Sequence, residues 1–435
     1  MSSREWKEIY LSDITDVVID YRGKTPKKLG GEWIEKGYKA LSAKNIKTGK
    51  IVQIDTIRFV DEDLYRKWMK EEVKKGDILI TSEAPFGEVF YWDSDEKIVL
   101  SQRLFGIRIK NEFCSKYVYH YMTTHEFQSE LDSRATGTTV RGLRQPELMK
   151  CKLVLPTLPE QKAIAHILST LDEKIEVNNQ INKTLENIAQ TIFKQWFVDF
   201  EFPNGEKEPY KSSGGEMVES ELGMIPKGWE VVELATIINV KHGYAFKSDY
   251  FSDIPTNKVL LTPGNFRIGG GFKDDKLKYY DEKVEYPSDY VLNEEDILIT
   301  MTDLSKDGDT LGYPIMLPKR KYAMLHNQRL GKIEIKNNLV PAEYLYYLFC
   351  TREYRGYILG SATGTTVKHT APKRILAYKI ALPKYNVLKD YGNAISNIMK
   401  LFSDISYQNG VLLKVRDSLL PKLMSGEIRV PIEEN

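Results

Sequence analysis

Two stretches of the chain carry apolar residues at the spacing of a long helix. From Ile164 to Trp196 the seam positions recur at alternating steps of four and three, which is typical of a coiled coil. A shift of 227 residues (391 − 164) reproduces the seam from Tyr391 to Leu423, with Asn182 matched by Asn409. Two helices of roughly 35–40 residues are predicted, with an asparagine pair that fixes their register. The predicted pairing residues are Leu168, Leu171, Ile175, Asn182, Leu185, Ile395, Ile398, Phe402, Asn409 and Leu412.

Short β-branched runs elsewhere predict strands. They are bounded by Gly, Asp and Asn, and they cover 51–54, 77–81 and 104–109 in the first half of the chain and 296–300 and 330–335 in the second. A tyrosine-rich helical pattern follows in each half, over 117–131 and 342–359. Each half is therefore expected to contain a globular unit of mixed α and β structure.

The order of these elements indicates a tandem duplication. The segment Ala-Thr-Gly-Thr-Thr-Val at 135–140 returns at 362–367, Asp-Ile-Leu-Ile-Thr at 77–81 returns at 296–300, and Gln102-Arg103 returns as Gln328-Arg329. The offset grows from 219 (296 − 77) to 226 (328 − 102), which predicts about seven extra residues in a loop near 305–309. Such a change fits two sites of one kind with different specificities, and neutral drift of the loop is the alternative.

The predicted fold class is α+β, an internal tandem repeat with pseudo-twofold symmetry. Two mixed α/β globular domains are separated by two long helices that form an antiparallel coiled coil. The polar, glycine-rich stretch between the copies predicts a linker. The predicted boundaries are a first globular domain at 1–155, a helical region at 156–200, the linker at 201–228, a second globular domain at 229–380, a second helical region at 381–428 and a tail at 429–435.

Composition limits the class of protein. A chain of 435 residues exceeds the size of one hydrophobic core, and 42% apolar with 28% charged residues is ordinary for a globular protein. Three widely spaced cysteines argue against a disulfide framework or a zinc cluster. Because no signal-like segment and no apolar run of about 18 residues occur, we expect a cytoplasmic protein without a membrane span. The net charge of +1 does not favour nucleic acid, since a protein that grips DNA alone is usually basic.

No catalytic constellation stands out in the sequence. A phosphate-binding loop and a dinucleotide-binding turn are missing, and His120 and His125 are five residues apart, which misses a shared helix face. We therefore expect a binding protein with no catalytic residue, no metal site and no cofactor of its own.

Matching loops in the two copies are rich in residue types that bind DNA. Thr, Lys and Arg donate to phosphates, Arg pairs with guanine, and Asn or Gln pairs with adenine. Two alternatives remain: Thr138 or Thr139 could cap a following helix within a turn, and the Gln-Arg pairs could make structural hydrogen bonds. The candidates are Arg22, Lys24, Thr25, Lys44, Asn45, Arg103, Thr136, Gly137, Thr138, Thr139, Arg141, Arg144, Lys241, His242, Asn265, Arg267, Arg329, Thr363, Gly364, Thr365, Thr366, Lys368 and His369.

These motifs resemble a known family, the specificity subunits of type I restriction–modification systems. The resemblance rests on the duplicated opening tryptophan, the repeated strand and Ala-Thr-Gly-Thr-Thr segments, the run Leu-Pro-Thr-Leu-Pro-Glu-Gln-Lys-Ala-Ile-Ala at 155–165, and the closing segment 419–428. It covers nearly the whole chain.

The resemblance implies a non-catalytic subunit with two target-recognition domains, each binding one half of a bipartite double-stranded DNA target. It also implies that the helices set the spacer and dock two methyltransferase subunits that carry S-adenosylmethionine and flip the target adenine. Restriction subunits using ATP and Mg²⁺ would join the complex. The second helical region has Leu-Pro-Lys-Tyr at 382–385 where the first has Leu-Pro-Glu-Gln at 158–161, so the two docking surfaces need not be equivalent. A scaffold whose duplicated domains bind protein is the alternative.

Overall fold

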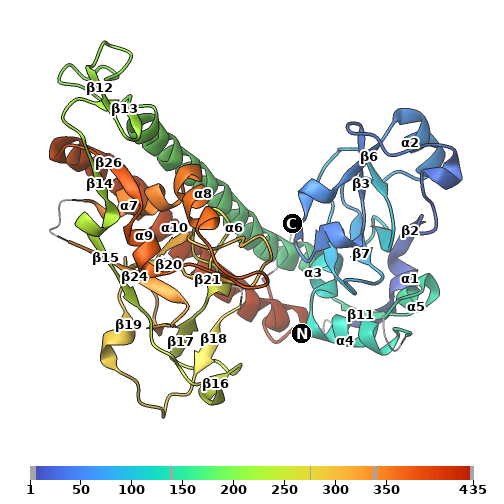
Figure 1. Cartoon of the computed structure of the whole chain (residues 1–435). Helices are drawn as coiled ribbons and strands as arrows, with labels where there is room; N and C mark the ends of the chain where they lie inside the picture. Colours follow the sequence, from blue (N-terminus) through green and yellow to red (C-terminus); the bar gives the residue numbers. More distant parts are fainter. Residues whose placement is uncertain (1–5, 138–140, 275, 337–339, 432–435) are drawn as a thin grey trace. The chain divides into compact units, whose positions relative to one another are not determined.

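The computed structural model describes residues 6–137, 141–274, 276–336 and 340–431. The chain divides into two compact units, residues 1–177 with 410–435 and residues 178–409. Both long helices cross this division, so each unit contains a part of each helix (Figure 1).

The first unit contains two sheets that share a core. An antiparallel sheet has the order β2 (Thr15–Asp20), β10 (Leu104–Ile109), β7 (Ile78–Thr81), β8 (Val89–Tyr91). A second sheet has the order β6 (Arg58–Val60), β3 (Tyr38–Leu41), β9 (Ile98–Leu100), with β3 and β9 parallel. β1 (Lys7–Tyr10) pairs with β11 (Lys152–Leu155), which joins the two ends of the globular part. The other elements are α1 (Leu11–Ile14), β4 (Ile46–Lys47), β5 (Lys50–Ile51), α2 (Glu62–Trp68), α3 (Ser115–Met122), α4 (His125–Ser133) and α5 (Gln145–Met149).

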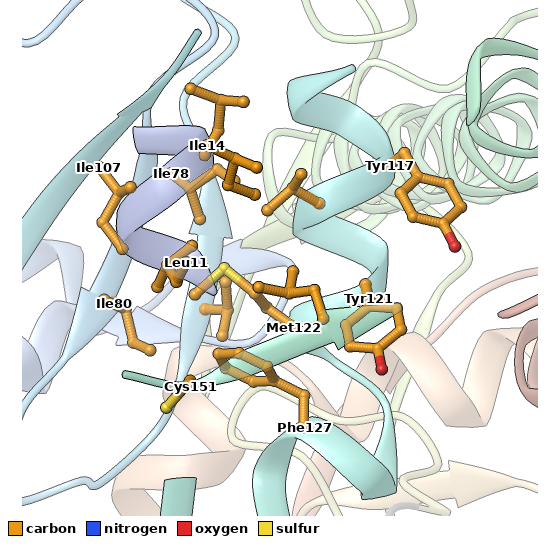
Figure 2. Close-up of a cluster of buried hydrophobic side chains, with 14 of the residues drawn as sticks. Leu11, Ile14, Ile78, Ile80, Ile107, Tyr117, Tyr121, Met122, Phe127 and Cys151 are labelled. Atoms are coloured by element: carbon orange, nitrogen blue, oxygen red, sulfur yellow. The ribbon is translucent and has the colours of Figure 1, made fainter. Parts of the chain in front are cut away.

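β7 is buried on both faces because its side chains alternate between two cores. Ile78 and Ile80 lie in the cluster with residues of α3 and α4 (Figure 2), whereas Leu79 lies in the cluster between the two sheets. Each such buried side chain contributes about 1.5–3 kcal/mol relative to an exposed one. A strand covered on both sides is expected to be a continuous apolar run, as this repeated segment is.

The second unit repeats this plan. Its antiparallel sheet has the order β15 (Ile238–His242), β24 (Leu330–Ile335), β20 (Ile297–Thr300), β22 (Pro314–Met316), and its other main sheet the order β16 (Phe251–Ser252), β18 (Lys278–Tyr280), β17 (Lys258–Leu261), β23 (Ala323–His326), β19 (Val291–Leu292). β14 (Glu230–Glu233) pairs with β26 (Lys379–Leu382), and β21 (Thr302–Asp303) pairs with β25 (Lys368–His369). Ile297 and Ile299 lie in one core and Leu298 in another, as in β7. The short helices are α7 (Ala342–Phe349), α8 (Arg352–Gly360) and α9 (Pro372–Leu376).

Each predicted tyrosine-rich helix is in fact two helices. Thr124 stands at the N-cap of α4, and its side chain accepts a hydrogen bond from the amide of Phe127. Thr351 does the same at the N-cap of α8 with the amide of Tyr354. The helical structure predicted over 117–131 and 342–359 is present, and an N-cap threonine divides each stretch into two helices. The predicted strand at 51–54 was too long, since β5 ends at Ile51.

The stretch predicted to be a linker is folded. Residues 201–228 contain the hairpin of β12 (Met217–Ser220) and β13 (Gly223–Pro226). Phe202 and Trp229 stack with ring centroids 5.3 Å apart and share a buried cluster with Ile225. Polar composition suggested flexibility, but a few aromatic side chains bury enough area to order the segment.

The two long helices have the predicted lengths. α6 (Leu158–Phe193) contains 36 residues and α10 (Tyr385–Met424) contains 40. A π-helical turn follows α6 at Lys194–Val198. In the first unit Arg416 donates to Asp172 at 3.0 Å. Of the predicted pairing residues, Leu168 and Ile395 are fully buried, Ile175 and Asn409 are nearly so, and Leu171, Asn182, Leu185, Ile398, Phe402 and Leu412 are partly buried.

The asparagines of the seam pair differently from the repeat match. In the second unit Asn178 donates to Asn409 at 2.8 Å, and Asn182 donates to Ser406 at 3.0 Å. Residue numbers rise on α6 as they fall on α10, so the helices run antiparallel. Equivalent positions of a repeat are not opposite each other in such a pair, and Asn409 therefore meets Asn178 rather than Asn182.

We predict that Asn178→Leu lowers the free energy of unfolding of the second unit by about 1–3 kcal/mol, because it removes a buried partner of Asn409. The double variant Asn178→Leu/Asn409→Leu should recover most of this loss, since two leucines pack against each other in place of the Asn178–Asn409 pair. Chemical denaturation of the four forms gives the coupling energy. Additive losses in the double variant would contradict a direct pairing.

Candidate functional site

The residue after the central strand connects the three repeated motifs. In the first unit the Ser82 amide donates to the carbonyl of Arg103 at 2.8 Å, and the Ser82 carbonyl accepts from the amide of Leu143 at 3.0 Å. In the second unit Met301 makes the same two bonds, with the Arg329 carbonyl at 2.9 Å and the Thr370 amide at 3.0 Å. We call this arrangement the strand-end junction. It brings the strand, the Gln-Arg loop and the end of the Thr-Gly-Thr-Thr loop together in each unit.

The Thr-Gly-Thr-Thr segment is closed by a pair of backbone hydrogen bonds in both units. Thr136 and Gly142 exchange amide–carbonyl bonds of 2.9 Å each, and Thr363 and His369 exchange bonds of 2.9 and 2.8 Å. The glycine is required in this loop: Gly364 has φ +94°, and a Cβ there would lie 1.9 Å from the carbonyl oxygen of Val367. In the second unit the loop therefore holds its backbone close, and Thr363, Thr365 and Thr366 are exposed.

The helix-capping alternative fails in the second unit. α9 begins after Ala371, with no side-chain cap, so Thr365 and Thr366 do not cap it, and both are exposed together with Thr363 and Gly364. In the first unit Thr136 and Gly137 are exposed, and Thr138 and Thr139 lie outside the described residues.

The strand-end junction of the first unit borders an open recess of about 550 Å³. Three predicted arginines, Arg22, Arg103 and Arg144, line this recess. Arg22 binds both carboxylate oxygens of Asp20 at 2.8 and 2.9 Å and lies 3.9 Å over the Phe105 ring, so it is largely committed to the fold. Arg144 is exposed and forms no ion pair within the described residues. The recess is lined by Arg22, Ser82, Glu83, Gln102, Arg103, Thr136, Gly142, Leu143 and Arg144.

Several predicted residues of the first unit support the fold. The Lys24 ammonium donates to the Trp68 carbonyl at 2.8 Å, and its pKa is lowered by burial and by nearby Lys70. Thr25 is partly buried and accepts from the Lys28 amide. Lys44 is exposed but does not line the recess, and Arg141 is exposed and paired with Asp132.

Asn45 and Asn265 are buried and use their amides internally. Each forms a capping box, with Ser42 and Thr262 respectively. The Nδ2 groups donate to backbone carbonyls, of Gln53 at 3.2 Å in the first unit and of Lys273 at 3.1 Å in the second. These two side chains are not available to DNA in this structure, so their predicted contact role is corrected to support of a loop.

In the second unit, three candidates lie at or near the strand-end junction. Arg329 is exposed at the strand-end junction, and His369 is exposed with its Nδ1 3.1 Å from the hydroxyl of Thr302. Lys368 is partly buried in β25, opposite Asp303. Three candidates lie elsewhere: Lys241 and His242 are in β15, where Lys241 donates to the Asp289 carbonyl and His242 is exposed, and Arg267 is exposed in a loop.

Sequence reasoning missed the junction residues Ser82, Leu143, Met301 and Thr370, as well as Glu83 and Thr302. The available signal was position, because each of these residues lies within three residues of the end of a repeated segment. The Gln-Arg pairs have exposed side chains, and their structural bonds come from the backbone.

The second copy is longer between β20 and β22 than the first copy is between β7 and β8. The step from Ile78 to its strand partner Tyr91 is 13 residues (91 − 78), and the step from Ile297 to Met316 is 19 (316 − 297). Six of the predicted extra residues therefore lie between β20 and β22. Burial raises the pKa of Asp303 at the start of this loop, but hydrogen bonds from Thr310 and Ser305 outweigh it and leave the pKa below its usual value.

In residues 6–137, 141–274, 276–336 and 340–431, no helix is both long and apolar enough for a membrane crossing. The same ranges contain no group of three or more His, Cys, Asp or Glu side chains that could hold a metal ion.

Known proteins resemble the chain over most of its length. The specificity subunit of the type I restriction enzyme MjaIX of Methanocaldococcus jannaschii is 28% identical over 370 residues, which cover 82% of this chain and 78% of that protein. The MjaVIII specificity subunit of the same organism is 24% identical over 440 residues, with 98% and 93% covered. The crystal structure of the type I restriction–modification S subunit from M. genitalium has the same fold, with a TM-score of 0.59 and 15% identity over 97% of both chains.

The family model described as the type I restriction modification DNA specificity domain matches the chain twice, over residues 3–187 and 226–412. Each match includes one strand-end junction. The chain therefore belongs to the family of type I restriction modification DNA specificity domains and contains two copies of that domain.

Proposed function

We propose that this chain is the DNA-specificity subunit of a type I restriction–modification complex, in which each globular domain binds one half of a bipartite target. The observation that carries the proposal is the strand-end junction, which presents polar loops on the same backbone frame in two copies of a DNA specificity domain. A frame repeated with different side chains suits two half-sites of different sequence.

We further propose that the long helices set the spacer and dock two methyltransferase subunits. In the second unit, α6 exposes Ile181 and Ile188, at 37% and 43% of their surfaces. These residues are seven positions apart, which places them on one side of the helix. Apolar side chains repeated on one exposed helix side favour a protein partner.

In this proposal the chain is non-catalytic and holds no cofactor. The methyltransferase subunits would bind S-adenosylmethionine, and restriction subunits would bind ATP and Mg²⁺. Partner subunits also account for the near-neutral charge of the chain, because they can supply much of the phosphate contact.

We predict that the chain, in complex with its methyltransferase subunits, binds a bipartite DNA target and that log affinity falls linearly with log salt concentration. The slope is about −0.9 for each neutralised phosphate. Fluorescence anisotropy with labelled duplexes at several salt concentrations measures it. Binding without sequence preference at every salt concentration would instead favour the protein scaffold.

We also predict that replacing residues 1–155 by the first domain of another specificity subunit changes one half-site only. Each domain carries its own junction and loops, so the second half-site should keep its sequence. Selection of bound sequences from a random library measures both halves. A change in both halves would contradict two independent recognition domains.

A further inference from the structure

The two units make the same backbone hydrogen bonds at the strand-end junction, but the side chains beside it differ. The residue after the strand-end junction is Glu83 in the first unit and Thr302 in the second. The Thr-Gly-Thr-Thr loops close at Gly142 and at His369. A Cβ on Gly142 would lie 3.3 Å from the Glu83 carboxylate, and Thr302 lies 3.1 Å from the His369 ring. One position therefore holds a carboxylate in the first unit and a hydroxyl–imidazole pair in the second.

Glu83 and Arg103 form an ion pair that faces the recess of the first unit. The Arg103 Nε lies 2.8 Å from a Glu83 oxygen, and the side chains are 48% and 34% exposed. An exposed pair contributes only about 0–1 kcal/mol to stability, so stability does not account for a carboxylate at this position. Because Arg103 contacts Glu83 through Nε, its two terminal nitrogens can donate to a ligand.

A carboxylate at a DNA interface repels phosphates and accepts hydrogen bonds only from base amino groups. In the major groove, cytosine N4 and adenine N6 both present amino donors to a carboxylate. The partner of cytosine is guanine, whose two acceptors O6 and N7 match the two terminal nitrogens of an arginine, whereas thymine beside adenine offers the single acceptor O4. A carboxylate beside a guanidinium with two free terminal nitrogens therefore complements a C·G pair best. Thymine in place of cytosine would face the carboxylate with its O4 acceptor, which is repulsive.

We propose that Glu83 and Arg103 are specificity-determining residues that together recognise a C·G base pair in the half-site bound by the first unit. The proposal rests on the proposed function. Glu83 accepts from the cytosine N4 amino group, and the terminal guanidinium nitrogens of Arg103 donate to guanine O6 and N7.

The second unit has no carboxylate at the equivalent position. His369 is exposed there, and its backbone remains bonded to Thr363 whatever its side chain is. The ring is oriented through Nδ1 by Thr302, which leaves Nε2 for a ligand. The two half-sites should therefore differ at this point, and a change at Glu83 should not reach the second one.

The test uses the chain in complex with its methyltransferase subunits and a library randomised in both half-sites. Glu83→Gln should lower the preference for cytosine over thymine at one position of one half-site by about tenfold, with the other half-site unchanged. His369→Ala should alter the other half-site only. Glu62→Gln is the matched control, since it makes the same charge change in an exposed ion pair with Arg66 that does not line the recess, and base preference should stay the same.

Arg103→Lys provides a second variant, because lysine keeps the charge and loses the planar fork. It should weaken the guanine preference at the same base pair. Retained binding with unchanged base preference in both Glu83→Gln and Arg103→Lys would overturn the proposal. A wild-type complex with no bipartite preference would instead refute the proposed function itself, which keeps the two failures distinguishable.

Discussion

The peptide groups of Ser82 and Met301 are the constraint on which each recognition domain depends. In each unit a single residue at the end of a buried strand makes two backbone hydrogen bonds. Its amide donates to the Gln-Arg loop, and its carbonyl accepts from the residue that follows the Thr-Gly-Thr-Thr loop. Both loops come from sequence far from the strand. The Gln-Arg loop leads into β10 or β24, and in the second unit the end of the Thr-Gly-Thr-Thr loop forms β25. The strand is held in turn by burial on two faces, so the loops inherit the rigidity of the core.

This arrangement separates the frame from the surface that it presents. The junction uses backbone groups alone, so serine in one unit and methionine in the other serve equally well. The next residue is free to vary, and it is glutamate in one unit and threonine in the other. The longer segment between β20 and β22 follows the same rule, because the order of the four-stranded sheet and the junction are the same in both units. Duplication followed by side-chain change is thus enough to produce two related sites of different chemistry.

Local patterns in the sequence predicted the frame well. Helical spacing gave both long helices, and the repeated apolar runs gave the central strands, since each signal comes from neighbouring residues. The junction could not be predicted, because it depends on pairings between segments separated by tens of residues. The burial of Asn45 and Asn265 was missed for another reason: an asparagine in a polar loop has the same sequence signature whether it faces solvent or holds that loop from inside.

Local patterns also failed to predict the partner of Asn409 and the folding of segment 201–228. Repeat equivalence identifies corresponding residues but not contacts, which an antiparallel helix pair assigns to other positions. Stacking of Phe202 on Trp229 orders a stretch whose composition is that of a linker.

Sequencing of DNA modified by this chain together with the proposed methyltransferase subunits tests the central claim most directly. The account predicts methylated adenines within two short, unlike sequences held at one fixed spacing. Methylation at sites with no second half, or with variable spacing between halves, would contradict a subunit in which two joined domains define one bipartite target.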